Sequence, residues 1–360
     1  MDKIYLLYFS DPIRMTIPST PNPLLHKAIE KGNLIRVQDL ILSGENIEAK
    51  NYNGQTALHY AVTEYQIPII AFLLQKGAKI EEKNNSGDNS LHIAVLYDYK
   101  PIVEILIKHG ADLEAKYGSL SLTPLHIASI YGQTEMAQLL ITNGAMIEAK
   151  DTRGYKPIHW ATMANESMIL ETLRQNGANI EAETDQGKTP LHVAASEGSE
   201  KSVERLIQMG ANIDAKTFRG LTPLHLAALS GQSLNIKVLL ENGANIEAEN
   251  NYGERPIHYA LNPLNIVEEN SFEYEKTVDM LIENGATLDV KDFDNQTPLH
   301  LAILCKKPSY VAMLVTFGAS LKIRNEDGMT PLECALKMDV SNVDNKLKCI
   351  KALLFSEMDM

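Results

Sequence analysis

The chain has 360 residues, of which 44% are hydrophobic and 22% charged, with a formal net charge of −13 and a pI near 5.3. This composition is typical of a folded globular protein, and the acidic balance argues against nucleic-acid binding. Three cysteines without paired spacing (Cys305, Cys334 and Cys349) argue against a disulfide scaffold. No stretch approaches the roughly 20 apolar residues that span a bilayer, so we expect a cytoplasmic protein without membrane insertion.

The chain begins with a segment that differs from the rest. Residues 1–20 contain Pro12 and Pro18 and one apolar run at residues 4–9. That run is about half as long as a signal-peptide core and lacks a clear cleavage site. We expect residues 1–20 to form an N-terminal lead-in or a cap.

From residue 21 onward, histidine recurs at a nearly fixed interval. Successive steps are 33, 33, 34, 33, 33, 33, 33 and 42 residues. The ladder histidines are His26, His59, His92, His126, His159, His192, His225, His258 and His300. A fixed period of this size indicates a solenoid with one helical hairpin per period.

One period, residues 220–252, predicts the local structure. Thr222 can cap a helix and Pro223 suits its first turn, while Gly231 can end it with positive φ. Leucines at helical spacing then form the core face of a second helix, which Gly243 can end. A turn-rich connection leads into the next period.

These features resemble the ankyrin repeat family. The motif TPLH begins at Thr123, Thr189, Thr222 and Thr297, with the relatives TALH at Thr56 and KPIH at Lys156. The resemblance covers about ten repeats and implies an all-α solenoid of helix-turn-helix units with hairpin-like fingers and a concave groove. We expect residues 21–360 to form a single array.

Departures from the period locate irregular repeats. The 42-residue step indicates a long insertion between two helices near residues 262–273, and the 34-residue step adds one residue to the finger at 117–121. Glu333 occupies the next histidine position, which together with a missing closing glycine predicts a divergent C-terminal capping repeat at 328–360.

The histidine ladder invites a metal hypothesis, which the spacing excludes. Zinc holds its ligands at about 2.0–2.1 Å, whereas packed helices of neighbouring repeats lie about 8–10 Å apart. The resemblance implies instead that these histidines bond locally to the threonine hydroxyl and backbone. Gly187-Lys188-Thr189 lacks the earlier glycine of a phosphate-binding loop, because Ala182 stands there. We therefore expect no catalytic, cofactor-binding or metal-binding residues.

A second ladder consists of acids followed two residues later by lysines. Acids stand at Glu48, Glu81, Glu114, Glu148, Glu181, Asp214, Glu247 and Asp289, and lysines at Lys50, Lys83, Lys116, Lys150, Lys216 and Lys291. In extended backbone, such positions share one face, so we expect solvated rows that neutralise each other. Glu183 and Glu249 replace lysine and suggest an acidic patch for a basic partner.

The resemblance implies that proteins bind at the finger tips and at the exposed ends of the first helices. Large apolar residues and arginine, which are frequent interface hot spots, occupy many such positions. The candidate protein-binding residues are Tyr52, Leu96, Tyr97, Ile130, Tyr131, Tyr155, Met163, Phe218, Arg219, Leu221, Leu229, Tyr252 and Phe293. Trp160 follows a ladder histidine and is expected in the core.

The sequence thus predicts a non-catalytic scaffold or adaptor that binds a partner protein and is monomeric when free. One alternative is a host-directed effector of an intracellular bacterium, virus or protist that uses the same groove, and would lie in the host cytoplasm. A remote alternative is an enzyme with activity in the insertion or the tail. Fold alone does not decide among these functions.

Overall fold

The computed structural model describes residues 23–164, 167–197, 199–261, 271–338 and 343–358. Its contacts divide the chain into two compact units, Met1–Asp185 and Gln186–Met360, and each is described by itself. The prediction of a single array over residues 21–360 stays a prediction. The expected lead-in at residues 1–20 lies outside the described residues.

The described part of the first unit contains ten helices, in pairs of a short first helix and a nine-residue second helix. Their bounds are α2 Leu24–Glu30, α3 Leu34–Leu42, α4 Ala57–Thr63, α5 Ile67–Gln75, α6 Ser90–Leu96, α7 Lys100–Lys108, α8 Pro124–Ile130, α9 Thr134–Thr142, α10 Pro157–Ala161 and α11 Ser167–Gln175. Apart from the antiparallel bridge between Tyr117 and Leu122, no β-structure occurs among the described residues.

The second unit, where it is described, repeats this order with two longer helices. Its helices are α12 Pro190–Glu197, α13 Glu200–Gln208, α14 Pro223–Leu229, α15 Ser233–Glu241, α16 Pro256–Ala260, α17 Ser271–Glu283, α18 Pro298–Leu304, α19 Pro308–Thr316, α20 Pro331–Lys337 and α21 Val343–Met358. Helix α17 has 13 residues and α21 has 16. The predicted insertion at 262–273 falls partly outside the described residues, and its last three residues open α17.

The first helices are buried on almost every side because they lie between neighbours. In α14 the residues from Pro223 to Ala228 are all buried, and alanines at 227 and 228 allow close helix approach. Second helices are amphipathic instead: α13 buries Val203 and Leu206 and exposes Lys201 and Glu204. This difference follows from small residues in one helix and a helical apolar stripe in the other.

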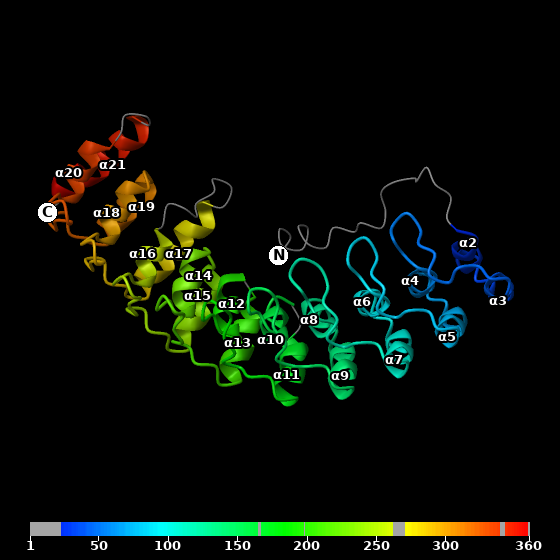
Figure 1. Cartoon of the computed structure of the whole chain (residues 1–360). Helices are drawn as coiled ribbons and strands as arrows, with labels where there is room; N and C mark the ends of the chain where they lie inside the picture. Colours follow the sequence, from blue (N-terminus) through cyan, green and yellow to red (C-terminus); the bar gives the residue numbers. More distant parts are fainter. Residues whose placement is uncertain (1–22, 165–166, 198, 262–270, 339–342, 359–360) are drawn as a thin grey trace. The chain divides into compact units, whose positions relative to one another are not determined.

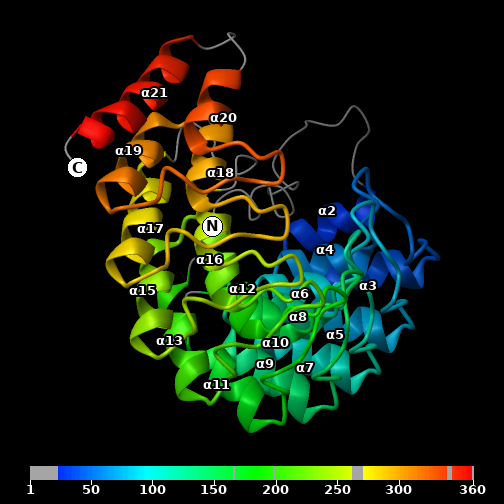
Figure 2. The same ribbon diagram turned by 90° about the vertical axis from the view of Figure 1, so that its left-hand side faces the viewer.

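Within each unit, the two kinds of helix form two adjacent rows. In the first unit α4, α6 and α8 pack in sequence, and α5, α7 and α9 lie in the second row (Figure 1). In the second unit α14, α16, α18 and α20 form one row and α15, α17, α19 and α21 the other (Figure 2). The predicted all-α stack of helix-turn-helix units is confirmed.

The fingers are joined tip to tip by backbone hydrogen bonds. Asn85 N–H donates to the Asn53 carbonyl at 3.0 Å, and Asn251 N–H donates to the Arg219 carbonyl at 3.0 Å. Each turn is braced internally: Asn51 Oδ1 accepts the amides of Asn53 and Gln55, both at 3.0 Å. The fingers are therefore ordered connections that hold tip residues at fixed spacing.

Gly220 shows why a finger requires glycine. Its φ is +77°, and a Cβ there would lie 2.8 Å from the Asn251 amide nitrogen of the next finger. Gly243, which follows α15, has φ +88° but open space at the Cβ position. Both glycines adopt positive φ, but only Gly220 lies against the backbone of the next finger.

We predict that Gly220→Ala lowers the free energy of unfolding more than Gly243→Ala does. Positive φ costs each alanine about 1 kcal/mol, and the backbone clash at position 220 adds roughly 1–3 kcal/mol. Urea denaturation of both variants measures the difference. Equal losses would contradict the close finger contact.

Candidate protein-binding surface

Most ladder histidines form capping boxes at the starts of the first helices, whereas His26 Nδ1 lacks a hydrogen-bond partner among the described residues. In α4, the Thr56 amide donates to His59 Nδ1 at 3.1 Å, and the Thr56 hydroxyl lies 2.8 Å from the same atom. Helix α14 repeats this arrangement with Thr222 and His225. Because Nδ1 accepts an amide proton, the imidazole proton resides on Nε2.

That Nε2–H reaches the following repeat. His59 donates to the Asp88 carbonyl at 3.1 Å, and His225 to the Glu254 carbonyl at 3.1 Å. Four further ladder histidines make the equivalent bond to a finger carbonyl: His26, His126, His192 and His300. His92 and His159 bond instead to carbonyls six positions earlier, those of Ala115 and Ala182. Within the described residues, His258 Nε2 has no such partner. One imidazole thus caps its own helix and anchors the next finger.

Burial keeps these imidazoles neutral. Desolvation lowers the pKa of His59, His92, His126, His192 and His225 to about 4, opposed by the backbone carbonyl that each ring bonds. The described residues contain no group of three histidine, cysteine or acidic side chains placed to hold a metal. Both ring nitrogens of residues such as His59 and His225 are occupied by hydrogen bonds within the fold.

The acidic ladder also binds backbone, which corrects the expectation of mutually neutralising rows. Glu81 accepts the Asp112 amide at 2.9 Å, and Asp214 accepts the Asn245 amide at 3.0 Å. The lysine row donates to carbonyls: Lys216 Nζ reaches the Glu249 carbonyl at 3.0 Å. These backbone bonds were not predictable, because i and i+2 spacing indicates only which side chains share a face.

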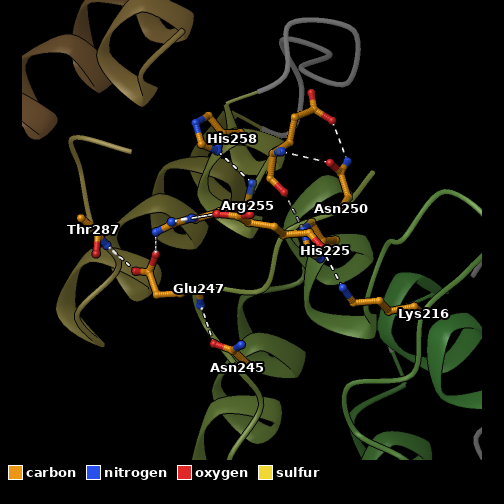
Figure 3. Close-up of polar contacts among 10 residues, drawn as sticks. Lys216, His225, Asn245, Glu247, Asn250, Arg255, His258 and Thr287 are labelled. Carbon is orange, nitrogen blue, oxygen red and sulfur yellow. Dashed lines mark hydrogen bonds and ion pairs between the residues drawn. The ribbon is translucent and has the colours of Figure 1, made fainter. Parts of the chain in front are cut away.

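The place of Glu249 is also different from the prediction. Arg255, which replaces the capping threonine of its repeat, pairs with Glu247 (Figure 3). It also pairs with Glu249. Its Nη2 lies 2.9 Å from Glu249 Oε1. Glu249 is therefore not the uncompensated acid that the sequence suggested. Glu183 is exposed and belongs to the other unit, so an acidic patch that includes both residues stays a prediction.

The thirteen candidate binding residues divide by exposure. Tyr52, Tyr97, Phe218, Arg219, Tyr252 and Phe293 are exposed, whereas Leu96, Tyr131, Tyr155, Met163 and Leu229 are half-buried. Ile130 and Leu221 are buried, with 5% and 9% of their surface exposed. Their assignment to the binding surface was wrong, because each packs into the core beside its neighbouring repeat.

Three exposed aromatic side chains occupy consecutive finger tips of the second unit. Phe218, Tyr252 and Phe293 are 65%, 55% and 72% exposed. The Phe293 amide donates to the Tyr252 carbonyl at 3.0 Å, and Asn251 Nδ2 donates to the Phe218 carbonyl at 2.9 Å. We call Phe218, Tyr252 and Phe293 the finger-tip row; its backbone spacing is fixed by these bonds.

The first unit has a tyrosine cluster that was only partly predicted. Tyr97 was a candidate, but Tyr65 and Tyr99 were missed. Tyr99 lies with its ring centroid 4.7 Å from Tyr65 and 5.4 Å from Tyr97. Tyr65 occupies a turn position where Gly32 and Gly132 stand in other repeats, and this replacement was a usable sequence signal.

Trp160 and Tyr155 lie beneath a finger of the first unit. Trp160 is 2% exposed, and its Nε1 donates to Asp151 Oδ2 at 3.2 Å. The Arg153 guanidinium lies 4.7 Å from the Tyr155 ring centroid and 5.4 Å from that of Trp160. Trp160 is thus part of the core, as its sequence position suggests.

The cysteines lack the environment of a nucleophile. Burial raises the pKa of Cys305 to about 12 and that of Cys349 to about 11, and it also raises the pKa of Cys334. A thiol with a raised pKa stays protonated and unreactive at neutral pH.

Among the described residues, no helix is sufficiently long and apolar to cross a membrane.

Capped helix pairs, joined fingers and repeated cross-repeat bonds define a stacked helical-hairpin repeat protein. The family model for ankyrin repeats (three copies) matches residues 25–117, 118–184, 191–269 and 269–360. The chain belongs to the ankyrin repeat family, whose repeats form protein–protein interaction domains. Comparison with curated proteins gives no match.

The histidine ladder predicts a specific loss of stability in acid. The pKa of His225 is lowered to about 4 in the folded chain from an ordinary 6.5, so unfolding takes up a proton between these values. Its contribution is complete above pH 6.5 and is lost as the pH falls toward 4, by at most about 1.4 kcal/mol per pH unit.

We therefore expect His225→Gln to reduce the dependence of unfolding free energy on pH in this window, as measured by urea titrations. Surface residue His109 lies outside the ladder, and His109→Gln serves as the control. An unchanged pH dependence in His225→Gln would refute the neutral-imidazole account.

Proposed function

We propose that this protein is a non-catalytic scaffold or adaptor that binds a partner protein through finger tips and the adjoining ends of first helices. The finger-tip row carries this proposal. Three large aromatic side chains are exposed there although no core requires them, and aromatic anchors contribute much of the energy at protein interfaces.

The backbone beneath the finger-tip row supports the same conclusion. The fingers of Phe218, Tyr252 and Phe293 are joined by main-chain hydrogen bonds, and Lys216 and Glu247 tie successive repeats below them (Figure 3). A surface ordered before binding loses little conformational entropy when a partner docks. Arg219, which directly follows Phe218 in the chain, is exposed and can donate hydrogen bonds to a partner.

A non-catalytic role is supported by the chemistry of the described side chains. The buried imidazoles are engaged at both nitrogens in most repeats, and burial raises the pKa of all three thiols. Neither group is prepared for proton transfer or nucleophilic attack. The exposed side chains at the finger tips are aromatic and polar, which suits recognition of a partner protein.

We expect a combined Phe218→Ala, Tyr252→Ala and Phe293→Ala variant to lose its captured protein partners. Affinity capture followed by binding titration should show affinity at least about tenfold weaker, since each aromatic anchor contributes on the order of 1–2 kcal/mol. Helix content measured by circular dichroism should not change, because the rings lie outside the helices.

Phe317→Ala is the matched control. Phe317 is 50% exposed but follows α19 in the second-helix row, so its removal should leave capture intact. Equal capture by the wild type and the combined variant would contradict the finger-tip assignment. Substrate turnover by the purified chain would contradict the non-catalytic role.

A further inference from the structure

A tyrosine-rich surface on the first unit lies apart from the fingers. Tyr65 follows α4, while Tyr97 and Tyr99 flank the turn between α6 and α7. Tyr65 and Tyr97 are 45% and 42% exposed. Tyr99 meets Tyr65 edge to face and stacks on Tyr97 with an interplanar angle of 18°. The rings form one exposed aromatic cluster across two neighbouring repeats.

Tyr65 is unfavourable for the backbone that holds it. Its φ is +54°, a conformation costly for a side-chain-bearing residue. Gly32 and Gly132 occupy the same turn position with φ of +61° and +65°. Asp98 and Lys306 occupy it with φ of +55° and +56°, so the position accepts a residue with a side chain at a cost in stability. The backbone at this position holds the exposed Tyr65 ring against Tyr99.

Carboxylates adjoin the rings. Glu64 directly precedes Tyr65, and its pKa is raised by burial and then by the nearby Glu30 carboxylate. Burial, Glu30 and Glu64 together raise the pKa of Tyr60 to about 12. Geometry places these groups together: Tyr60 and Glu64 lie four residues apart at the end of α4, and the ring of His26, one turn before Glu30 on α2, has its centroid 5.4 Å from that of Tyr60.

These acids lack a cation within the described part of the chain. Neither Glu30 nor Glu64 forms an ion pair there, although Lys27 and Lys31 lie on or directly after the same helix as Glu30. Two neighbouring carboxylates that repel each other gain energy when a cation binds between them. The charge of this surface is complementary to a basic ligand.

We propose that this surface binds an arginine- or lysine-bearing peptide segment of a partner protein. The tyrosine–carboxylate surface consists of Glu30, Tyr60, Glu64, Tyr65, Tyr97 and Tyr99. Tyrosine faces attract guanidinium and ammonium groups within about 6 Å, and carboxylates accept paired guanidinium hydrogen bonds. The inference rests on the proposed protein-binding function and specifies the chemistry of the partner at a second surface.

The test uses the full chain and a fluorescein-labelled peptide of Gly-Ser-Arg repeats, with Gly-Ser-Lys and Gly-Ser-Glu peptides for comparison. Fluorescence anisotropy at low ionic strength should show binding of the arginine peptide, weaker binding of the lysine peptide and none of the glutamate peptide. Because the carboxylates contribute, affinity should fall as salt is raised.

Tyr65→Gly separates recognition from folding. Glycine relieves the positive-φ conformation, so the melting temperature should be unchanged or raised, while affinity for the arginine peptide falls about tenfold. A Glu30→Gln and Glu64→Gln variant should bind about tenfold more weakly and with less salt dependence. Glu104→Gln, on the exposed surface of α7, should bind as the wild type does.

Arginine-peptide affinity that is unchanged in both Tyr65→Gly and Glu30→Gln/Glu64→Gln would overturn the inference, as would equal binding of the glutamate peptide. Absence of arginine-peptide binding, together with partner capture that still depends on the finger-tip row, would overturn this inference alone. The proposed scaffold function is tested separately: it would be contradicted if the combined finger-tip variant captured partner proteins as well as the wild type does.

Discussion

The structure depends on hydrogen bonds that run from the side chains of one repeat to the backbone of the next. Each repeat is too small to bury its apolar faces alone, so stability comes from stacking. Stacking by apolar contact allows sliding, whereas a bond from His225 Nε2 to the Glu254 carbonyl fixes the register. The acids and lysines add parallel bonds, such as Asp214 to the Asn245 amide and Lys216 to the Glu249 carbonyl. Three side-chain types thus satisfy buried or half-buried finger backbone that has no sheet or helix partner.

This bonding explains why the recognition surface can vary while the framework repeats. The finger backbone is satisfied by His225 and Lys216, so much of the surface of tip side chains such as Phe218 and Tyr252 stays exposed. Ends of first helices have the same freedom, which permits Tyr65 in a glycine position. We therefore expect binding residues at the finger tips and at the ends of first helices, where an exposed or destabilising side chain does not disturb the repeat.

Much of the fold was predictable because its signals are local. The caps at Thr222 and helix-ending glycines depend on neighbouring residues, and the histidine period follows directly from repetition. The cross-repeat bonds were not predictable, since the Asp214 partner lies 31 residues away and is a backbone amide. For the surface, Phe218 and Tyr97 are exposed as predicted, whereas Ile130 and Leu221 are buried, because burial depends on the adjacent repeat. Arg255 compensates Glu249 through a fold-specific contact.

The central claim is that neutral ladder imidazoles bridge adjacent repeats through Nε2–H. Nitrogen-15 NMR of histidine-labelled protein at about pH 6, below the ordinary histidine pKa, tests it most directly. The structure predicts neutral rings with the proton on Nε2 and slow exchange of that proton at His59, His126 and His225. Protonated rings, or a proton on Nδ1, at these positions would contradict the account.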